Sequence, residues 1–171
     1  MIKLIPYSSI YEEQTIPRIF QFFEFHQSLM TECQSTDDNH NAQDEESRRT
    51  LSEWLVHPNA LFVLIDGDSS IGFIRICYRG SNVAWIEDIF VDADRRGQGI
   101  ATSAIREVER IIADTPGYSA VCMDVSPHNS DALKLYHKLG YVDISLITIR
   151  KELGEIKRNK RIRIFGLDFN Y

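Results

Sequence analysis

Cysteine is scarce in this sequence, and long apolar runs are missing. Cys33, Cys77 and Cys122 are odd in number and widely spaced, so they indicate neither a disulfide framework nor a CxxC metal or redox site. No stretch approaches the roughly 18 consecutive apolar residues of a membrane span. The opening residues also lack the apolar run and cleavage site of a secretory signal. We therefore expect a cytoplasmic protein with no membrane partner.

An excess of basic residues is also missing. The net charge is -6 and the pI is about 5.4, which argues against nucleic acid as a partner, because phosphate binding needs a basic surface. Several positive charges gather beyond Gly154, so the rest of the chain is more acidic than the total suggests and favours a cationic substrate. The basic residues of this tail are Lys157, Arg158, Lys160, Arg161 and Arg163.

Motifs of several common catalytic classes are absent. The sequence has no GxSxG hydrolase elbow and no GxxxxGK[ST] nucleotide loop. Its histidines have no recognisable metal-ligand spacing, so no metal is expected. They are His26, His40, His57, His128 and His137.

The composition is typical of a soluble globular protein. The chain has 171 residues, of which 43% are hydrophobic and 26% charged. This length fits one domain over residues 1–171. The tail 154–171 contains a strand-like run at 161–165, which we predict to be an edge strand or a dimer contact. A homodimer is therefore among the expected partners.

The first half of the chain predicts a strand, two helices and an antiparallel meander. Ile2 and Leu4 alternate with a polar residue, and apolar residues recur at helical spacing from about Thr15. Residues 34–46 contain no large apolar side chain and predict a solvated acidic loop. A short helix follows over 51–55 and stops at Pro58. Three strand-like runs come next, at 60–65, 71–78 and 83–91.

The second half alternates helices with strands. The pattern predicts a helix from Ile100, ended by Pro116, and then a buried strand at 120–125. A short helix over 129–138 and an apolar strand at 141–149 that closes the sheet complete the pattern. We therefore predict an α/β (α+β) fold with a mixed central sheet.

The strongest local signal lies at a strand-to-helix junction. Glycines there allow a sharp turn and leave backbone N–H groups free at the positive end of a helix, which suits a pyrophosphate. A tight loop with exposed arginines is the alternative. The segment consists of Arg95, Arg96, Gly97, Gln98, Gly99, Ile100, Ala101 and Thr102.

A dinucleotide site is a second alternative, since Asp124 ends the next strand at a distance close to that of a ribose-binding acid. Three features weigh against it. Thr102 occupies the third glycine position, the motif follows the fourth predicted strand and not the first, and residues 92–96 separate the strand from the glycines.

The same residues resemble the GNAT superfamily of N-acetyltransferases. The phosphate loop of that family follows the pattern Arg/Gln-x-x-Gly-x-Gly/Ala, matched here by Arg96, Gly99 and Ala101. The strand AWIEDIFV and the run NSDALKLYHKLGY also resemble the flanking motifs, in the expected order. The resemblance covers about residues 60–149 and implies a sheet whose first half is antiparallel, with a parallel pair in the middle and about four flanking helices.

The resemblance also implies acetyl-CoA as co-substrate, held between the strands at 83–91 and 120–125. Its pyrophosphate would meet the N–H groups from Arg96 to Ala101, with Arg95 and Arg96 adding charge. Asn129 matches a position that contacts the pantetheine in many members. The backbone of the first strand would pair with the pantetheine and polarise the acetyl carbonyl near Ile89, Phe90 and Val91.

Amine attack on a thioester needs two proton transfers. On the resemblance, Glu87 is the predicted base, Asp88 holds the cationic substrate, and Tyr136 is the acid. Periodicity alone leaves other interpretations open. Adjacent strand residues point to opposite faces, so Glu87 or Asp88 would face solvent, and Tyr136 falls on the inward face of its helix, as a core tyrosine would.

The expected acceptor is a primary amine, and a small cationic one such as a polyamine or an aminoglycoside is favoured. The acidic loop, with Asp37, Asp38, Asp44, Glu45 and Glu46, supports this preference, although such loops are commonly only solvated. A non-catalytic acyl-CoA-binding module and a protein or peptide N-acetyltransferase remain alternatives.

Overall fold

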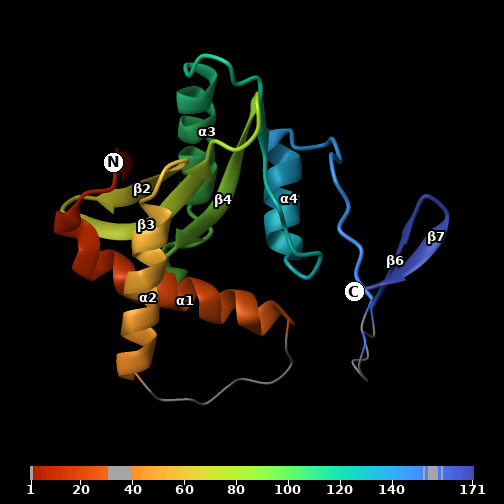
Figure 1. Cartoon of the computed structure of the whole chain (residues 1–171), viewed down its shortest axis with the longest axis horizontal. Helices are drawn as coiled ribbons and strands as arrows, with labels where there is room; N and C mark the ends of the chain where they lie inside the picture. The colour runs from red at the N-terminus through yellow and green to blue at the C-terminus, as the bar shows by residue number, and fades with distance from the viewer. Residues whose placement is uncertain (1, 31–39, 152, 154–157, 159) are drawn as a thin grey trace. The chain divides into compact units, whose positions relative to one another are not determined.

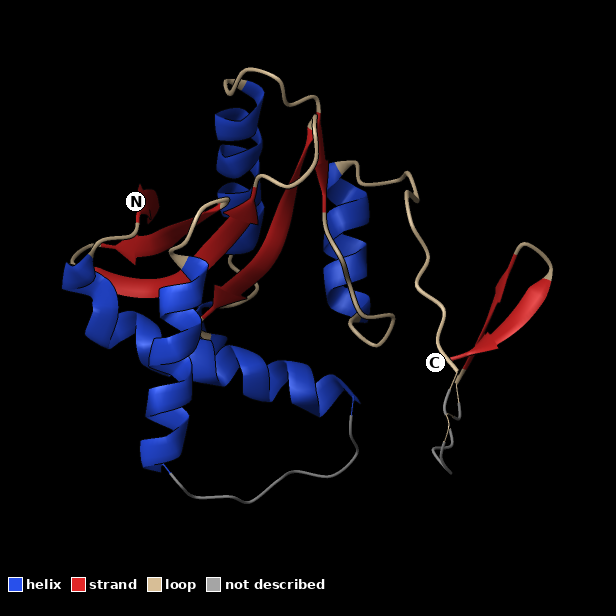
Figure 2. Ribbon diagram, viewed as in Figure 1, coloured by secondary structure: helices blue, strands red, loops and turns tan. Residues whose placement is uncertain are grey.

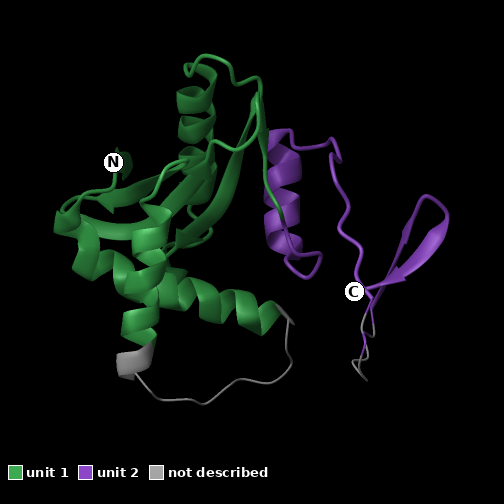
Figure 3. Ribbon diagram, in the orientation of Figure 1, with its two compact units in different colours: residues 1–124 green, residues 125–171 purple. Residues whose placement is uncertain are grey.

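The computed structural model describes residues 2–30, 40–151, 153, 158 and 160–171. The chain divides into two compact units, residues 1–124 and residues 125–171 (Figure 3). Each unit is described by itself below. The single domain over 1–171 stays a prediction.

The first unit is built on a five-stranded sheet in the order β1-β2-β3-β4-β5 (Figure 1). Neighbouring strands are antiparallel except β4 and β5, which are parallel. The predicted fold class is thereby confirmed. The strands are β1 (Ile2–Pro6), β2 (Asn59–Asp66), β3 (Ser69–Cys77), β4 (Val83–Val91) and β5 (Ala120–Cys122).

Helices cover both faces of this sheet (Figure 2). Apolar residues of α1 (Glu12–Met30) and α2 (His40–Trp54) form one core with Phe73 and Phe90 of the sheet. On the other face, α3 (Ile100–Ala113) packs against Leu64 and Val91. The buried side chains of α3 recur at helical spacing, as the sequence predicts. They are Ile100, Ala104, Ile105, Val108 and Ile112.

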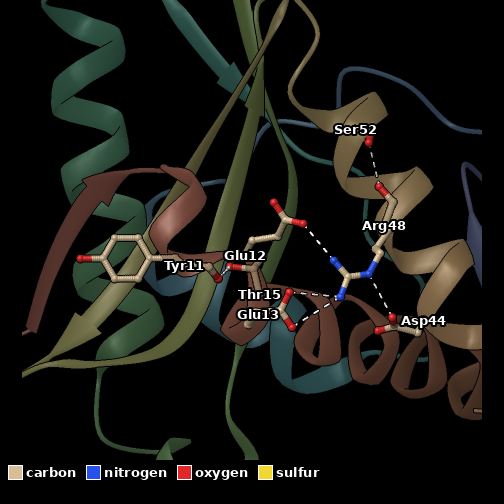
Figure 4. Close-up of polar contacts among 7 residues, drawn as sticks. All are labelled: Tyr11, Glu12, Glu13, Thr15, Asp44, Arg48 and Ser52. Atoms are coloured by element: carbon tan, nitrogen blue, oxygen red, sulfur yellow. Dashed lines mark hydrogen bonds and ion pairs between the residues drawn. The ribbon is translucent and has the colours of Figure 1, made fainter.

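The predicted acidic loop is wrong over residues 40–46, because α2 begins at His40. Asp44 pairs with Arg48 one helical turn later, at 3.0 Å, which supports the helix despite its polar sequence. Arg48 also reaches Glu12 at 2.9 Å and Glu13 at 3.2 Å on α1 (Figure 4). The polar segment thus joins two helices. Asp37 and Asp38 lie outside the described residues.

The second unit contains α4 (Ser130–Leu139) and a hairpin of β6 (Arg161–Ile164) and β7 (Leu167–Asn170). The strand predicted near the end of the chain is therefore β6, and its strand partner is β7. The strand predicted at 141–149 is wrong, because no strand is formed there. Apolar alternation needs a neighbouring strand to become a ladder, and Ile144 and Leu146 remain exposed.

A glycine fixes the distance between β3 and β4. A Cβ atom placed on Gly72 would lie 2.2 Å from the carbonyl oxygen of Phe90. We expect Gly72→Ala to force the strands apart and to lower the free energy of unfolding by about 1–3 kcal/mol. Urea denaturation measures this, with Ser69→Ala at an exposed position of β3 as control. Equal stability of the two variants would contradict the close approach.

Candidate active site

The ladder between β4 and β5 is short. It joins Val83 to Ala120 and ends with Trp85 opposite Cys122, whereas β4 continues to Val91. Among the described residues no other strand takes the place of β5 beside this part of β4. Backbone groups along this edge of β4 therefore stand ready for an extended ligand.

A β-bulge lies in β4 where the ladder with β5 ends. Arg75 is opposite Asp88 and Ile76 is opposite Ile86, so Glu87 is the extra residue. A bulge disturbs the alternation of side chains and turns the strand. The interpretation in which Glu87 or Asp88 simply faces solvent loses its basis, because Glu87 and Asp88 keep only 19% and 13% of their side-chain surface exposed.

The glycine loop connects β4 to α3. Gly97 and Gly99 have φ values of 74° and 77°, in the left-handed region that glycine adopts without strain. Gly99 precedes α3 and provides no side-chain cap, so the N–H groups of the first helical turn lack intrahelical acceptors. A Cβ atom at either glycine would touch nothing within 4 Å. The open loop and uncapped helix end fit a pyrophosphate.

The two arginines before the loop contact the protein itself. Arg95 pairs with Asp66 at the end of β2, and its buried Nε has no partner among the described residues. Arg96 Nε donates to the carbonyl of Val91 at 2.9 Å. The Arg96 guanidinium also lies 4.9 Å from the ring centre of Phe25. These contacts hold the loop in place, and binding of phosphate by either arginine stays a prediction.

Arg18 of α1 fixes the start of the loop, which sequence reasoning missed. Its guanidinium donates to both carboxylate oxygens of Asp92, at 2.8 and 2.6 Å, and to the carbonyls of Gln14 and Ser70 at 2.5 Å. Such a two-point pair sets orientation as well as distance. The partners are 74 residues apart, so no local pattern indicates the pair.

Glu87 is paired with Arg79. Arg79 Nε lies 3.2 Å from Glu87 Oε1, and an Nη atom lies 3.5 Å from Asp124 Oδ2. The same guanidinium lies 3.9 Å from the ring centre of Trp85. Asp124, considered above as a ribose ligand, is thus part of this cluster. The role of Glu87 as base stays a prediction.

Asp88 is paired with Arg75 on β3. Arg75 Nε donates to Asp88 Oδ2 at 2.5 Å, and Arg75 also donates to Asn59 and stacks on Trp54. Burial raises the pKa of Asp88, and the charge and hydrogen bond of Arg75 oppose that rise. This carboxylate already has a cation as partner, and its predicted role in holding the acceptor remains untested.

A cavity of about 530 Å³ lies between α1 and α2. His26, one of its lining residues, has a lowered pKa because burial outweighs the attraction of Asp88. Glu24 and Glu46 also line the cavity, so this space next to the core is acidic. Sequence reasoning missed the cavity because half of its α2 side, Gln43 and Glu46, comes from residues predicted as a loop. The other lining residues are Phe20, Phe23, Gln27, Ser47 and Thr50.

Asn129 and Tyr136 belong to the second unit. Asn129 caps α4, with its side-chain oxygen accepting from the N–H of Ala132 at 3.2 Å. Tyr136 contacts the ring of Tyr141 edge to face, and burial raises the pKa of Tyr136. A phenol with a raised pKa stays protonated at neutral pH, as an acid must. Both predicted roles still await a test.

The described residues contain neither a metal-site cluster nor a membrane-spanning helix. No group of three or more His, Cys, Asp or Glu side chains in this part of the chain has the arrangement of a metal site. No helix of the same residues is long and apolar enough to cross a membrane.

The sequence model of the acetyltransferase (GNAT) family matches residues 22–141. The chain belongs to this family. The match begins within α1 and takes in α2, the sheet without β1, the glycine loop, α3 and α4. It confirms the family predicted from the loop and its two flanking motifs.

Among curated proteins, the chain is similar to thialysine N-epsilon-acetyltransferases. The protein from Bos taurus is 35% identical over 68 residues, which are 40% of this chain and 39% of that protein. The protein from Mus musculus is 37% identical over 82 residues, 48% of this chain and 47% of that protein. The chain thus matches less than half of the length of these relatives.

The fold of this chain is similar to that of solved acetyltransferase structures. The aminoglycoside acetyltransferase AAC(6')-Iy, in complex with a CoA-containing bisubstrate analog, has a TM-score of 0.63 at 20% identity. The alignment covers 89% of this chain and 99% of that one. The shared feature is the fold.

We expect Arg75 and Asp88 to contribute to the stability of this acetyltransferase family member only when both are present. Removing one partner leaves a buried charge alone, so Asp88→Ala should lower the free energy of unfolding by about 3–5 kcal/mol. The double variant Arg75→Met with Asp88→Leu should regain most of that loss. Denaturation of Arg75→Met, Asp88→Leu and their double variant measures the coupling. Additive losses would contradict the prediction.

Proposed function

We propose that the chain transfers the acetyl group of acetyl-CoA to a primary amine on a small cationic acceptor. The observation that carries this proposal is the free edge of β4, which runs from the bulge at Glu87 directly into the glycine loop. A ligand with an extended chain and a pyrophosphate at one end would fit the edge of β4 with its chain and the glycine loop with its pyrophosphate. Acetyl-CoA is such a molecule.

The roles of individual residues follow from that placement. N–H groups from Arg96 to Ala101 would hold the pyrophosphate, and the backbone near Ile89, Phe90 and Val91 would pair with the pantetheine and polarise the thioester carbonyl. Arg95, Gly97, Gln98, Ile100 and Thr102 complete the loop. The Oδ1 of Asn129 caps α4, which leaves its Nδ2 as the group for a pantetheine carbonyl.

The chemical step is direct attack. The amine nitrogen, after loss of a proton to Glu87 directly or through a water, forms a bond to the thioester carbon. The carbon–sulfur bond then breaks, the departing thiolate takes a proton from Tyr136, and the second proton lost by the nitrogen restores the Tyr136 hydroxyl. The products are an N-acetylated amine and CoA. Burial raises the pKa of Tyr136, so its hydroxyl holds its proton until the thiolate leaves.

A primary amine as acceptor has two supports. The curated relatives from cattle and mouse are named for acetylating the side-chain amine of thialysine. Acidic groups also lie in the first unit, at Glu87, Asp88 and Asp124 of the β4 and β5 region and in the cavity of Glu24 and Glu46. These charges favour a cation over an anion.

Glu87→Gln tests the base. The amide keeps the shape of the side chain but cannot accept the ammonium proton, so we expect kcat to fall by about 100-fold or more. The assay is thiol release from acetyl-CoA over a panel of thialysine, lysine, polyamines, aminoglycosides and peptides. Glu109→Gln, at a partly buried position of α3, is the matched control. Acetyl-CoA binding without release for any amine would instead favour a binding module.

Tyr136→Phe tests the acid. Loss of the hydroxyl removes the proton donor for the thiolate, and we expect kcat to fall about tenfold or more, with little change in acetyl-CoA affinity by calorimetry. Tyr118→Phe serves as control because Tyr118 is part of the first unit and contacts the ring of Tyr78 at a tilt. Unchanged turnover of Tyr136→Phe would remove this residue from the mechanism.

A further inference from the structure

Three groups surround the guanidinium of Arg79. The carboxylates of Glu87 and Asp124 lie 3.2 and 3.5 Å from its nitrogens, and the face of the Trp85 ring lies 3.9 Å from its central carbon. Arg79 follows β3, whereas its neighbours come from β4 and from the segment after β5. The arginine therefore reaches across β4 to the place where the ladder with β5 ends.

Two carboxylates and an aromatic face are the groups that recognise a cation. Carboxylates supply charge, and the negative face of an indole ring attracts ammonium and guanidinium groups alike. Trp85, Glu87 and Asp124 therefore form a cation site, which we call the Trp85 site. In this structure the Trp85 site is filled by the chain's own Arg79.

The hold on Arg79 is weak compared with that on Arg75. The side chains of Arg79 and Asp124 are 45% and 80% exposed, so water and salt screen their attraction, whereas Glu87 is 19% exposed. Arg75 and Asp88 are only 15% and 13% exposed, and Arg75 has two further contacts. Of these two ion pairs on the same pair of strands, the one with Arg79 is the one that a ligand can exchange.

The position of the site matters for the chemistry. Glu87 is the bulge residue and the proposed base, and Arg79 places a cation at the carboxylate oxygen where an ammonium group would bind. A primary ammonium that entered the Trp85 site would replace one cation by another, at little electrostatic cost. The carboxylate of Glu87 would then face the amine that it must deprotonate.

We propose that Arg79 is an internal stand-in for the acceptor, and that the reacting ammonium group displaces it from the Trp85 site. The inference rests on the proposed function, because it assigns the acceptor side of the same reaction. Arg79 is thereby a residue that sets acceptor affinity, and Trp85 and Asp124 are contacts of the acceptor cation.

Calorimetry with thialysine and with spermidine, in the presence of CoA, tests the proposal without turnover. Arg79→Gln removes the internal cation, and at least one of the two amines should bind about two- to tenfold more tightly than to the unchanged protein. Arg79→Lys keeps a cation and should bind as the unchanged protein does. Arg110→Gln, which removes an exposed arginine between Glu107 and Asp114 on α3, is the matched control.

A second variant tests the aromatic contact. In the Arg79→Gln background, Trp85→Leu should reverse the gain in amine affinity, whereas acetyl-CoA affinity should stay the same in every variant. Circular dichroism and the melting temperature show whether each variant is folded. Amine binding to Arg79→Gln that is no tighter than to the unchanged protein, or weaker acetyl-CoA binding, overturns the inference.

Kinetics separate this inference from the proposed function. Tighter amine binding should appear as a lower KM for the amine in Arg79→Gln, with kcat kept. Transfer that proceeds with an unchanged KM leaves the acetyltransferase proposal intact and removes Arg79 from it. Absence of transfer with every amine, together with tighter amine binding to Arg79→Gln, would support the cation site and contradict the acetyltransferase activity.

Discussion

The site in the first unit depends on one feature of the sheet, which is that β4 continues beyond the end of its pairing with β5. β4 pairs with β5 only as far as Trp85, and the bulge at Glu87 lies just beyond that point. Backbone N–H and C=O groups must find partners, so an edge that opens inside a sheet needs either water or a ligand. The same strand leads into the glycine loop, and one chain segment thus supplies both an edge for an extended arm and an end for its phosphates.

Such an opening requires that β4 be held firmly from its other side. Gly72 lets β3 approach the backbone of Phe90, and Arg75 ties β3 to Asp88 next to the bulge. Arg18 anchors Asp92 at the far end of the strand. These contacts place rigid packing and buried charge on the β3 side. β4 can therefore lack a partner on its β5 side without losing its position.

Local patterns were sufficient to predict the loop and most elements, because the conformational demands of Gly97 and Gly99 and the apolar face of α3 lie within a few residues. Contacts between distant residues were not predictable in this way, and the partners of Arg18, Arg75 and Arg79 emerged only from the fold. Two predictions failed for related reasons. Ion pairs turned a polar stretch into part of α2, and the apolar run at 141–149 had no neighbouring strand.

Arg75 and Arg79, which pair with Asp88 and Glu87, differ in how exposed their side chains are to solvent. A buried pair that loses one member leaves an unpaired charge in a medium of low polarity, so Arg75 and Asp88 stay together. An exposed pair exchanges partners at little cost, because water solvates whichever charge is released. The Arg79 side chain is 45% exposed and so is nearer to the second kind, although Glu87, the carboxylate that it covers at the bulge, is 19% exposed. A neutral or acidic acceptor would have to leave Arg79 in place, or displace it and leave Glu87 and Asp124 without a cation. A cationic acceptor instead supplies the positive charge that Arg79 gives up.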